Sequence, residues 1–158
     1  MAKARPEPTP EELAERQERY DAYLADAILK PLPYFKHDAD AHDDPKLQDL
    51  RDTLGLKGYG RYWLLVEVLA EREGHVYEVE DRATGRDRWR RFAAEIECDG
   101  GEAEAKTFVA ALEELALIDS ELLRERGKVG IRRLSDNAYE MAEAIAKRRL
   151  GAWKTNGR

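Results

Sequence analysis

Residues 37–44 gather two histidines and four aspartates, and imidazole and carboxylate groups are ordinary ligands of divalent metal ions. The candidate ligands are His37, Asp38, Asp40 and His42. The segment lacks the turn glycine and the terminal glutamate of a calcium-binding loop, and its histidines are not three or four residues apart. The alternative is a loop whose aspartates cap the following helix. We expect the capping loop, with no metal ion and no other cofactor.

Other patterns that could support catalysis are missing or incomplete. The stretch Gly58-Tyr59-Gly60 follows no predicted strand and lacks the third glycine of a dinucleotide-binding turn, and no Gly-Lys-Ser/Thr phosphate loop occurs. Cys98 is the only cysteine, so it can form neither an internal disulfide nor a cysteine-rich zinc site. The carboxylates are too numerous for one pair to stand out as acid and base. We therefore expect a non-enzymatic protein, and a reducing cytoplasm as its setting.

A third chemical feature is positive charge, which is concentrated in the second half. Residues 1–81 carry a net charge of −8 and residues 82–158 a net charge of +2. Ten cations could contact DNA phosphates without reading sequence. An equally physical alternative is that they pair with the abundant glutamates and stay solvated. The ten candidates are Arg86, Arg88, Arg90, Arg91, Lys106, Arg124, Arg126, Lys128, Arg132 and Arg133.

The elements that position these residues are organised around an apolar stretch. Residues 59–73 are apolar on almost every side, which predicts a buried central helix. Before it, Asp43 or Asp44 can cap a helix over residues 45–54, and Gly55 should end that helix. After it, residues 75–81 alternate apolar and polar as a short strand does, and a loop follows over residues 82–87.

The second half predicts a winged helix. Residues 88–98 and 102–116 each place apolar side chains at helical spacing. Residues 117–123 and 128–134 are then predicted to be the two strands of a hairpin, and helix, turn, helix, hairpin is the order of that fold. The second helix is too rich in glutamate to lie in a DNA groove, so we expect the hairpin, or wing, to contact the DNA backbone. Ser135 and Asp136 should cap a last helix.

The N-terminal helix has a different character. Thr9, Pro10 and Glu12 form a helix-start pattern, and Pro31 prevents the helix from passing residue 30. A narrow apolar seam on an otherwise polar helix suits an arm that packs on the same chain or on a second copy. The seam residues expected to mediate oligomerisation are Leu13, Tyr20, Tyr23, Leu24 and Ile28.

Two short motifs carry a resemblance to a known family. Tyr34-Phe35-Lys36-His37-Asp38, followed by Leu56-Lys57-Gly58-Tyr59-Gly60 at the head of an apolar helix, resembles the Lin-type N-terminal domain of phage and bacterial replication proteins. The similarity extends over roughly residues 34–134. It implies a DnaD-like winged-helix fold and the role of a replisome organiser that associates with DNA and with itself.

We therefore predict a mainly α protein with a small β-hairpin, built as a winged helix-turn-helix domain with an N-terminal helical arm. Its divisions are a disordered tail (1–8), the arm (9–30), the winged-helix domain (34–150) and a flexible end (151–158). The expected function is that of a self-associating adaptor whose wing contacts DNA non-specifically, beside a possible replication partner and without a membrane. A protein-binding or oligomerisation module without DNA contact is the alternative, and a metal-dependent enzyme is the weakest option.

Overall fold

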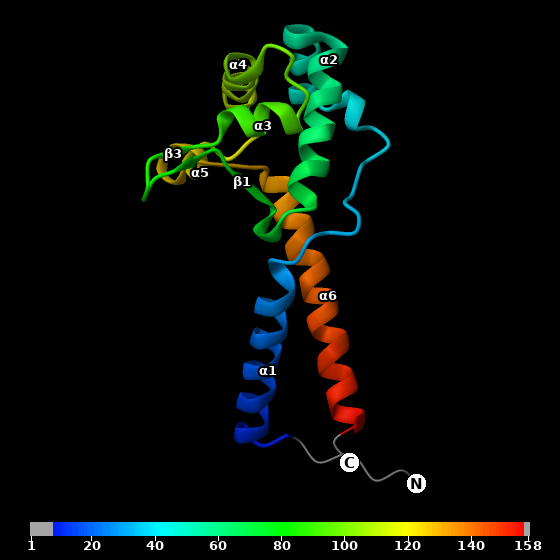
Figure 1. The fold of residues 1–158 in the computed structure, drawn as a ribbon. Coiled ribbons are helices and arrows are strands. Elements are labelled where there is room, and N and C mark those ends of the chain that lie inside the picture. The colour runs from blue at the N-terminus through cyan, green and yellow to red at the C-terminus, as the bar shows by residue number, and fades with distance from the viewer. Residues whose placement is uncertain (1–7, 157–158) are drawn as a thin grey trace. The chain divides into compact units, whose positions relative to one another are not determined.

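The computed structural model describes the backbone of residues 8–156 and the side chains of residues 8–153. It divides the chain into two compact units, shown in Figure 1. One unit is Lys30–Ala138, here called the central unit. The segments before and after it form the second, here called the arm unit. Most of the predicted tail (1–8) and the last two residues of the predicted C-terminal end lie outside the described residues.

The longest helix of the central unit is α2, Pro45–Ala70. Asp44 caps it as predicted, because its carboxylate accepts from the backbone N–H groups of Lys46 and Leu47. The predicted break at Gly55 is confirmed as a kink, at which this residue has φ 67° and ψ −170°. A positive φ favours glycine, so the two predicted helices meet without an intervening loop. A single turn of 3₁₀ helix, η1 (Ala41–Asp43), precedes α2.

The sheet topology differs from the predicted hairpin. After α2 and the short η2 (Glu73–His75), strand β1 (Val76–Glu78) pairs antiparallel with β4 (Lys128–Gly130), which lies about fifty positions later in the chain. Strands β2 (Glu80–Asp81) and β3 (Arg86–Asp87) form a small hairpin, in which β2 is the end of the segment predicted as a strand and β3 lies in the segment predicted as a loop.

Helices α3 (Trp89–Glu95) and α4 (Gly101–Glu114) follow, and both confirm predicted helices. The predicted apolar face of α3 is buried: the ring of Phe92 lies edge-on to the rings of Tyr77 and Trp89, at centroid distances of 4.9 and 5.8 Å. Phe108 and Leu112 of α4 are buried in the same core. Apolar side chains of α2, α3, α4 and β4 therefore share one hydrophobic centre.

The prediction of a hairpin over residues 117–134 is wrong. Residues 120–126 form helix α5 (Ser120–Arg126) instead of a strand. The Asp119 side chain accepts from the backbone N–H of Leu122 at its start, and Gly127 ends it with φ 63°. Both ends therefore carry ordinary helix signals. The returning strand is also shorter than predicted, because the last helix, α6 (Arg132–Asn156), begins directly after Ile131.

The arm unit combines α1 (Pro10–Ile28) with the part of α6 from Tyr139 onward. The predicted capping box of α1 is confirmed by reciprocal hydrogen bonds between Thr9 and Glu12. The two helices lie side by side in Figure 1, and Arg149 of α6 forms an ion pair of 2.7 Å with Asp26 of α1. Helix α6 continues through the predicted flexible end as far as Asn156.

Taken together, the described residues form a mainly helical fold with small antiparallel sheets. Within the described part of the chain, every helix is too short or too polar to cross a membrane.

Candidate functional site

The ten cations predicted to contact DNA lie on or beside six elements of the central unit. Arg86 lies on β3, Arg88 precedes α3, and Arg90 and Arg91 lie on its first turn. Lys106 lies on α4. The five cations predicted to lie on the wing are divided among three elements: Arg124 and Arg126 on α5, Lys128 on β4, and Arg132 and Arg133 at the start of α6.

Half of these cations have acidic partners in the structure. The pairs are Arg88–Glu78 (3.0 Å), Arg91–Glu95 (3.4 Å), Lys106–Glu102 (2.5 Å), Arg124–Glu113 (2.6 Å) and Arg133–Asp38. Among the described residues, the other five form no ion pair: Arg86, Arg90, Arg126, Lys128 and Arg132. The alternative, that the cations pair with acidic side chains, therefore holds for five of them. The other five remain available to contact DNA.

Three of the available cations belong to one surface region. We call Arg86, Arg126 and Lys128 the basic flap, because the β2–β3 hairpin that carries Arg86 is fixed to the α5–β4 connection. The Gly127 carbonyl accepts from the backbone N–H groups of Val79 and Glu80, at 2.9 and 3.0 Å. A Cβ at Gly127 would lie 2.3 Å from the Glu80 carbonyl oxygen, so only glycine allows this approach.

The acids of the hairpin are engaged within it. Asp81 accepts from the Thr84 hydroxyl and from the backbone at Ala83 and Thr84, and these bonds lower the pKa of its carboxyl group. Asp87 accepts from the backbone N–H of Trp89. Glu80 pairs with Arg82, which also donates to the Arg124 carbonyl. The neighbours of Arg86 thus stabilise the turn and the start of α3.

Three of the four candidate metal ligands contact other protein side chains. The His37 ring stacks on Trp63 at 3.9 Å, Asp38 pairs with Arg133, and His42 lies 3.4 Å from Asp43. Across the residues that the structure describes, no three His, Cys, Asp or Glu side chains come together as a metal site would require.

The two motifs of the family resemblance form one aromatic cluster. Phe35 and His37 stack on Trp63, while the Tyr59 and Tyr62 rings meet the same indole edge-on at 6.2 and 5.3 Å. The segment from Tyr34 to Asp38 therefore packs on the helix that follows Gly55. Such contacts are a sufficient structural reason for both motifs.

The seam residues of α1 contact α6 within the arm unit. The Tyr20 hydroxyl donates to Glu143 at 3.5 Å, and the Arg149 guanidinium lies 5.8 Å from the centre of the Tyr23 ring. Leu24 and Ile28 are half-buried, whereas 49% of Leu13 is exposed.

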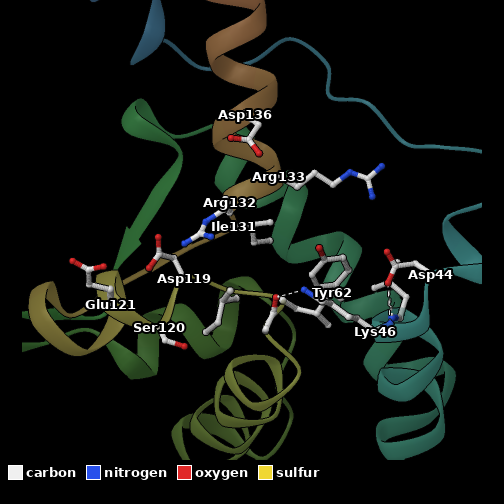
Figure 2. A pocket seen from close by; sticks show the side chains of 14 residues that line it. Asp44, Lys46, Tyr62, Asp119, Ser120, Glu121, Ile131, Arg132, Arg133 and Asp136 are labelled. Carbon is white, nitrogen blue, oxygen red and sulfur yellow. Dashed lines mark hydrogen bonds between the residues drawn. The ribbon is translucent and has the colours of Figure 1, made fainter.

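Sequence reasoning missed an open groove of about 590 Å³ in the central unit, shown in Figure 2. It lies between the start of α2, the α4–α5 connection and the start of α6. Its floor is apolar and its rim is charged. The lining residues are Asp44, Lys46, Leu47, Tyr62, Ala116, Leu117, Ile118, Asp119, Ser120, Glu121, Ile131, Arg132, Arg133 and Asp136. Three distant segments contribute, so no local sequence pattern could have revealed it.

Tyr62 is the least expected part of this groove. Only 5% of it is exposed, and its hydroxyl forms no hydrogen bond with any described residue. Burial raises the pKa of Tyr62 to about 12; the Arg133 charge opposes this shift and the Asp44 charge adds to it. The hydroxyl is therefore a neutral hydrogen-bond donor at physiological pH.

Cys98 shows no sign of activation. Its thiol is buried, and burial raises its pKa, so the protonated form is favoured. The nearby buried cation, Arg61, donates to the carbonyls of Ile96 and Glu97 and pairs with Glu104 at 2.9 Å. These contacts give Arg61 a structural role between α2 and the turn before α4.

Comparisons with known proteins give one family and no individual relative. No curated protein and no solved structure matches the chain. A family model described as Lin1244/Lin1753-like, N-terminal, matches residues 34–129, which is more than half of the 158 residues and includes both aromatic motifs. The chain belongs to the Lin1244/Lin1753-like N-terminal family.

Proposed function

We propose that this protein is a non-enzymatic, self-associating adaptor that contacts the DNA backbone, as the resemblance to replisome organisers of the DnaD-like winged-helix type implies. The observation that carries the proposal is the basic flap. Arg86, Arg126 and Lys128 have no acidic partner among the described residues, and the hairpin acids near Arg86 are engaged with other groups. Exposed cations held on a fixed scaffold attract phosphates and release counterions on binding.

The architecture supports backbone contact more than base reading. Helices α3 and α4 are joined by a short turn, as in a helix-turn-helix pair, and strands β1 and β4 flank them in sequence. The second helix carries Glu102 and Glu104 in its first turn, and its Lys106 is paired with Glu102. Carboxylates in a DNA groove would repel the phosphates. In place of the predicted wing, each two-stranded element carries an available cation, Arg86 on the β2–β3 hairpin and Lys128 on β4.

Self-association is supported by the apolar surface of the arm unit. Leu13 of α1 and Tyr139 of α6 are each about half exposed, and several other seam residues are only partly covered. Two helices alone cannot enclose such side chains, whereas a four-helix arrangement made by two copies can. A second copy is therefore the proposed partner of this surface.

DNA binding should be measured with fluorescently labelled duplex and single-stranded DNA at low and physiological salt. In the variant Arg86→Glu/Lys128→Glu we expect affinity to fall at least tenfold, and the salt dependence to decrease by about two phosphate contacts. The matched control is Arg16→Glu/Arg148→Glu, which changes net charge equally on exposed arm-unit cations. Equal losses in both variants, or no salt-dependent binding in the parent protein, would contradict the proposal.

Self-association should be measured by sedimentation equilibrium. We expect Leu13→Glu to shift the parent protein toward the monomer, because a charge replaces an apolar contact. Leu56→Glu is the control, since 79% of Leu56 is exposed and this residue belongs to the central unit and not to the seam of α1. A protein that assembles through Leu13 yet binds no DNA would be the alternative, an oligomerisation module.

A further inference from the structure

Three helices begin at the groove of Figure 2, and two of them are already capped. Asp44 accepts from the first amides of α2, and Asp119 accepts from an amide of α5. A carboxylate is favoured at these positions because the N-terminal end of a helix carries partial positive charge. Two of the acidic residues that line the groove, Asp44 and Asp119, therefore serve as N-caps of helices α2 and α5.

The third helix, α6, has no such cap. Ile131 precedes it, and an apolar side chain cannot accept a hydrogen bond. Within residues 8–153, no side chain accepts from the backbone N–H groups of Arg132 or Arg133. The first turn of this helix also places two cations at its positive end, where cations are unfavourable unless an anion is near. Arg133 has Asp38 as a partner, whereas Arg132 has no ion pair among the described side chains.

Tyr62 is an independent indication of a ligand. It reaches the groove from α2, and Figure 2 shows its ring between Asp44 and the start of α6. Nine-tenths of the residue and more is buried, yet its hydroxyl has no partner in the described structure. The hydroxyl is not among the fully enclosed polar atoms that lack a partner, so it is an accessible part of an otherwise buried side chain and can donate to a ligand. Its opening onto a groove of about 590 Å³ leaves room for a small molecule.

We propose that this groove is a binding site for an oxyanion, specifically a phosphoryl group. The Tyr62 hydroxyl, the first amides of α6 and the Arg132 guanidinium supply its donors, and the bound oxyanion caps α6 as Asp44 and Asp119 cap their helices. Of the remaining acids of the lining, Figure 2 shows Glu121 to the left of Asp119 and Asp136 above Arg132. Their repulsion favours a ligand that carries a single phosphoryl group over a polyphosphate.

The phosphoryl group has two sources, a free nucleotide or phosphate and a phosphate of DNA. The proposal does not depend on the basic flap, because the flap residues do not line the groove. If the Arg86→Glu/Lys128→Glu variant binds DNA as the parent does, the proposal of a phosphoryl site in the groove still stands. If the groove binds no phosphoryl group, the proposal of DNA contact by the basic flap still stands.

The test is a titration of the ¹⁵N-labelled protein with inorganic phosphate and with adenosine monophosphate at constant ionic strength. We expect saturable shifts of the backbone amide signals of Arg132 and Arg133. Tyr62→Phe keeps the ring and removes one donor to a charged ligand, so it should weaken binding about tenfold. Tyr59→Phe, on the same helix but outside the groove, should bind as the parent does.

Two further arms identify the source and test the cation. Arg132→Gln should weaken binding at least as much as Tyr62→Phe, with Arg90→Gln as its control. Saturation by adenosine monophosphate at lower concentration than by phosphate assigns the site to a nucleotide. Shifts of the same amides by a short DNA duplex assign it to the DNA backbone. Shifts that rise linearly with phosphate, or that are equal in the parent and Tyr62→Phe, would overturn the proposal.

Discussion

The central unit buries large side chains, whereas the arm unit buries mainly alanines. Phe92, Phe108 and Leu69 are fully or almost fully enclosed in the first. In the described part of the second, the buried residues are Ala27, Ala142, Ala146 and Leu150. Polar contacts such as Asp26–Arg149, and a cation over an aromatic ring in Arg19–Trp153, supplement this small core.

This difference suggests that the central unit provides most of the folding stability and that the arm unit provides the surface for self-association. Burial of large apolar groups is the main stabilising contribution to folding, so the central unit can hold a fixed arrangement of charges. Exposed ion pairs contribute at most about 1 kcal/mol each, so the arm unit has little stability of its own. A weakly stabilised pair of helices with exposed apolar residues is a natural place for a second copy to bind. Four measurements would sharpen or break this comparison.

The largest expected effect is that of a core deletion. Phe92→Ala should lower the free energy of unfolding by about 3–5 kcal/mol, because it leaves a cavity beside Tyr77 and Trp89. Leu24→Ala in α1 should lower it by only about 1 kcal/mol, since that leucine is half-buried. Urea unfolding followed by tryptophan fluorescence and circular dichroism would measure both values. Equal losses would remove the distinction between the units.

Two glycines should respond in opposite directions. Gly127→Ala should destabilise the central unit by about 3 kcal/mol, because φ is positive and the new Cβ would clash with the Glu80 carbonyl. Gly151→Ala lies within α6, where a Cβ meets no atom within 4 Å, and should stabilise the arm unit by up to about 1 kcal/mol. Thermal unfolding would give both signs, and a stabilised Gly127→Ala protein would contradict the described contact.

Acid sensitivity should reside in the central unit. Burial acts to raise the pKa of Glu95, but hydrogen bonds from Arg72 and Tyr77 and the nearby arginine charges outweigh it, so the pKa is lowered. A group whose pKa is lowered on folding stabilises the protein above its unfolded pKa, which is about 4.3 for glutamate. This contribution disappears as pH falls through the folded value.

Glu95→Gln should therefore reduce stability at pH 7 and flatten its decline below about pH 4.3. The matched comparison is Asp26→Asn, which breaks an exposed pair and should change little at any pH. Urea midpoints from pH 7 to pH 3 would test both. A pH profile of Glu95→Gln parallel to that of the parent would show that this carboxylate has no such role.

The smallest effect should come from the cap of α1. Thr9→Ala removes the side-chain acceptor of the capping box and should weaken the helix by about 1 kcal/mol. Hydrogen exchange should speed up at the first amides of α1 and remain unchanged in α2. Ser in place of Thr9 should restore protection, since it keeps the hydroxyl. Protection that is lost throughout the central unit would mean that the two units are more strongly coupled than their separate cores indicate.

Local signals were predictable from the sequence, and long-range pairing was not. Thr9, Asp44 and Gly55 each act within a few residues of their own position, and the structure bears out each prediction. Residues 117–123 were wrongly predicted as a strand because a short apolar run does not by itself distinguish a strand from a helix. Asp119 and Gly127 were the signals that could have decided for a helix.

The ten candidate DNA-contacting cations could be identified from the sequence, but their ion-pair partners could not. Arg124 pairs with Glu113 and Arg133 with Asp38, across eleven and ninety-five positions of sequence respectively. The groove depends on the same kind of distant contact. The sequence gave no sign that the buried Tyr62 of α2 would line a groove together with residues 116–121 and 131–136, more than fifty positions later.

The pairing of β1 with β4 also has a consequence for how the chain folds. Val76 pairs with Gly130, so the chain between them is a long loop whose two ends must come together before the sheet can form. Closing so long a loop is entropically unfavourable until the intervening helices have shortened it. We expect this sheet to form late in refolding, and pulse-labelled amides of Val129 should gain protection after those of Phe108.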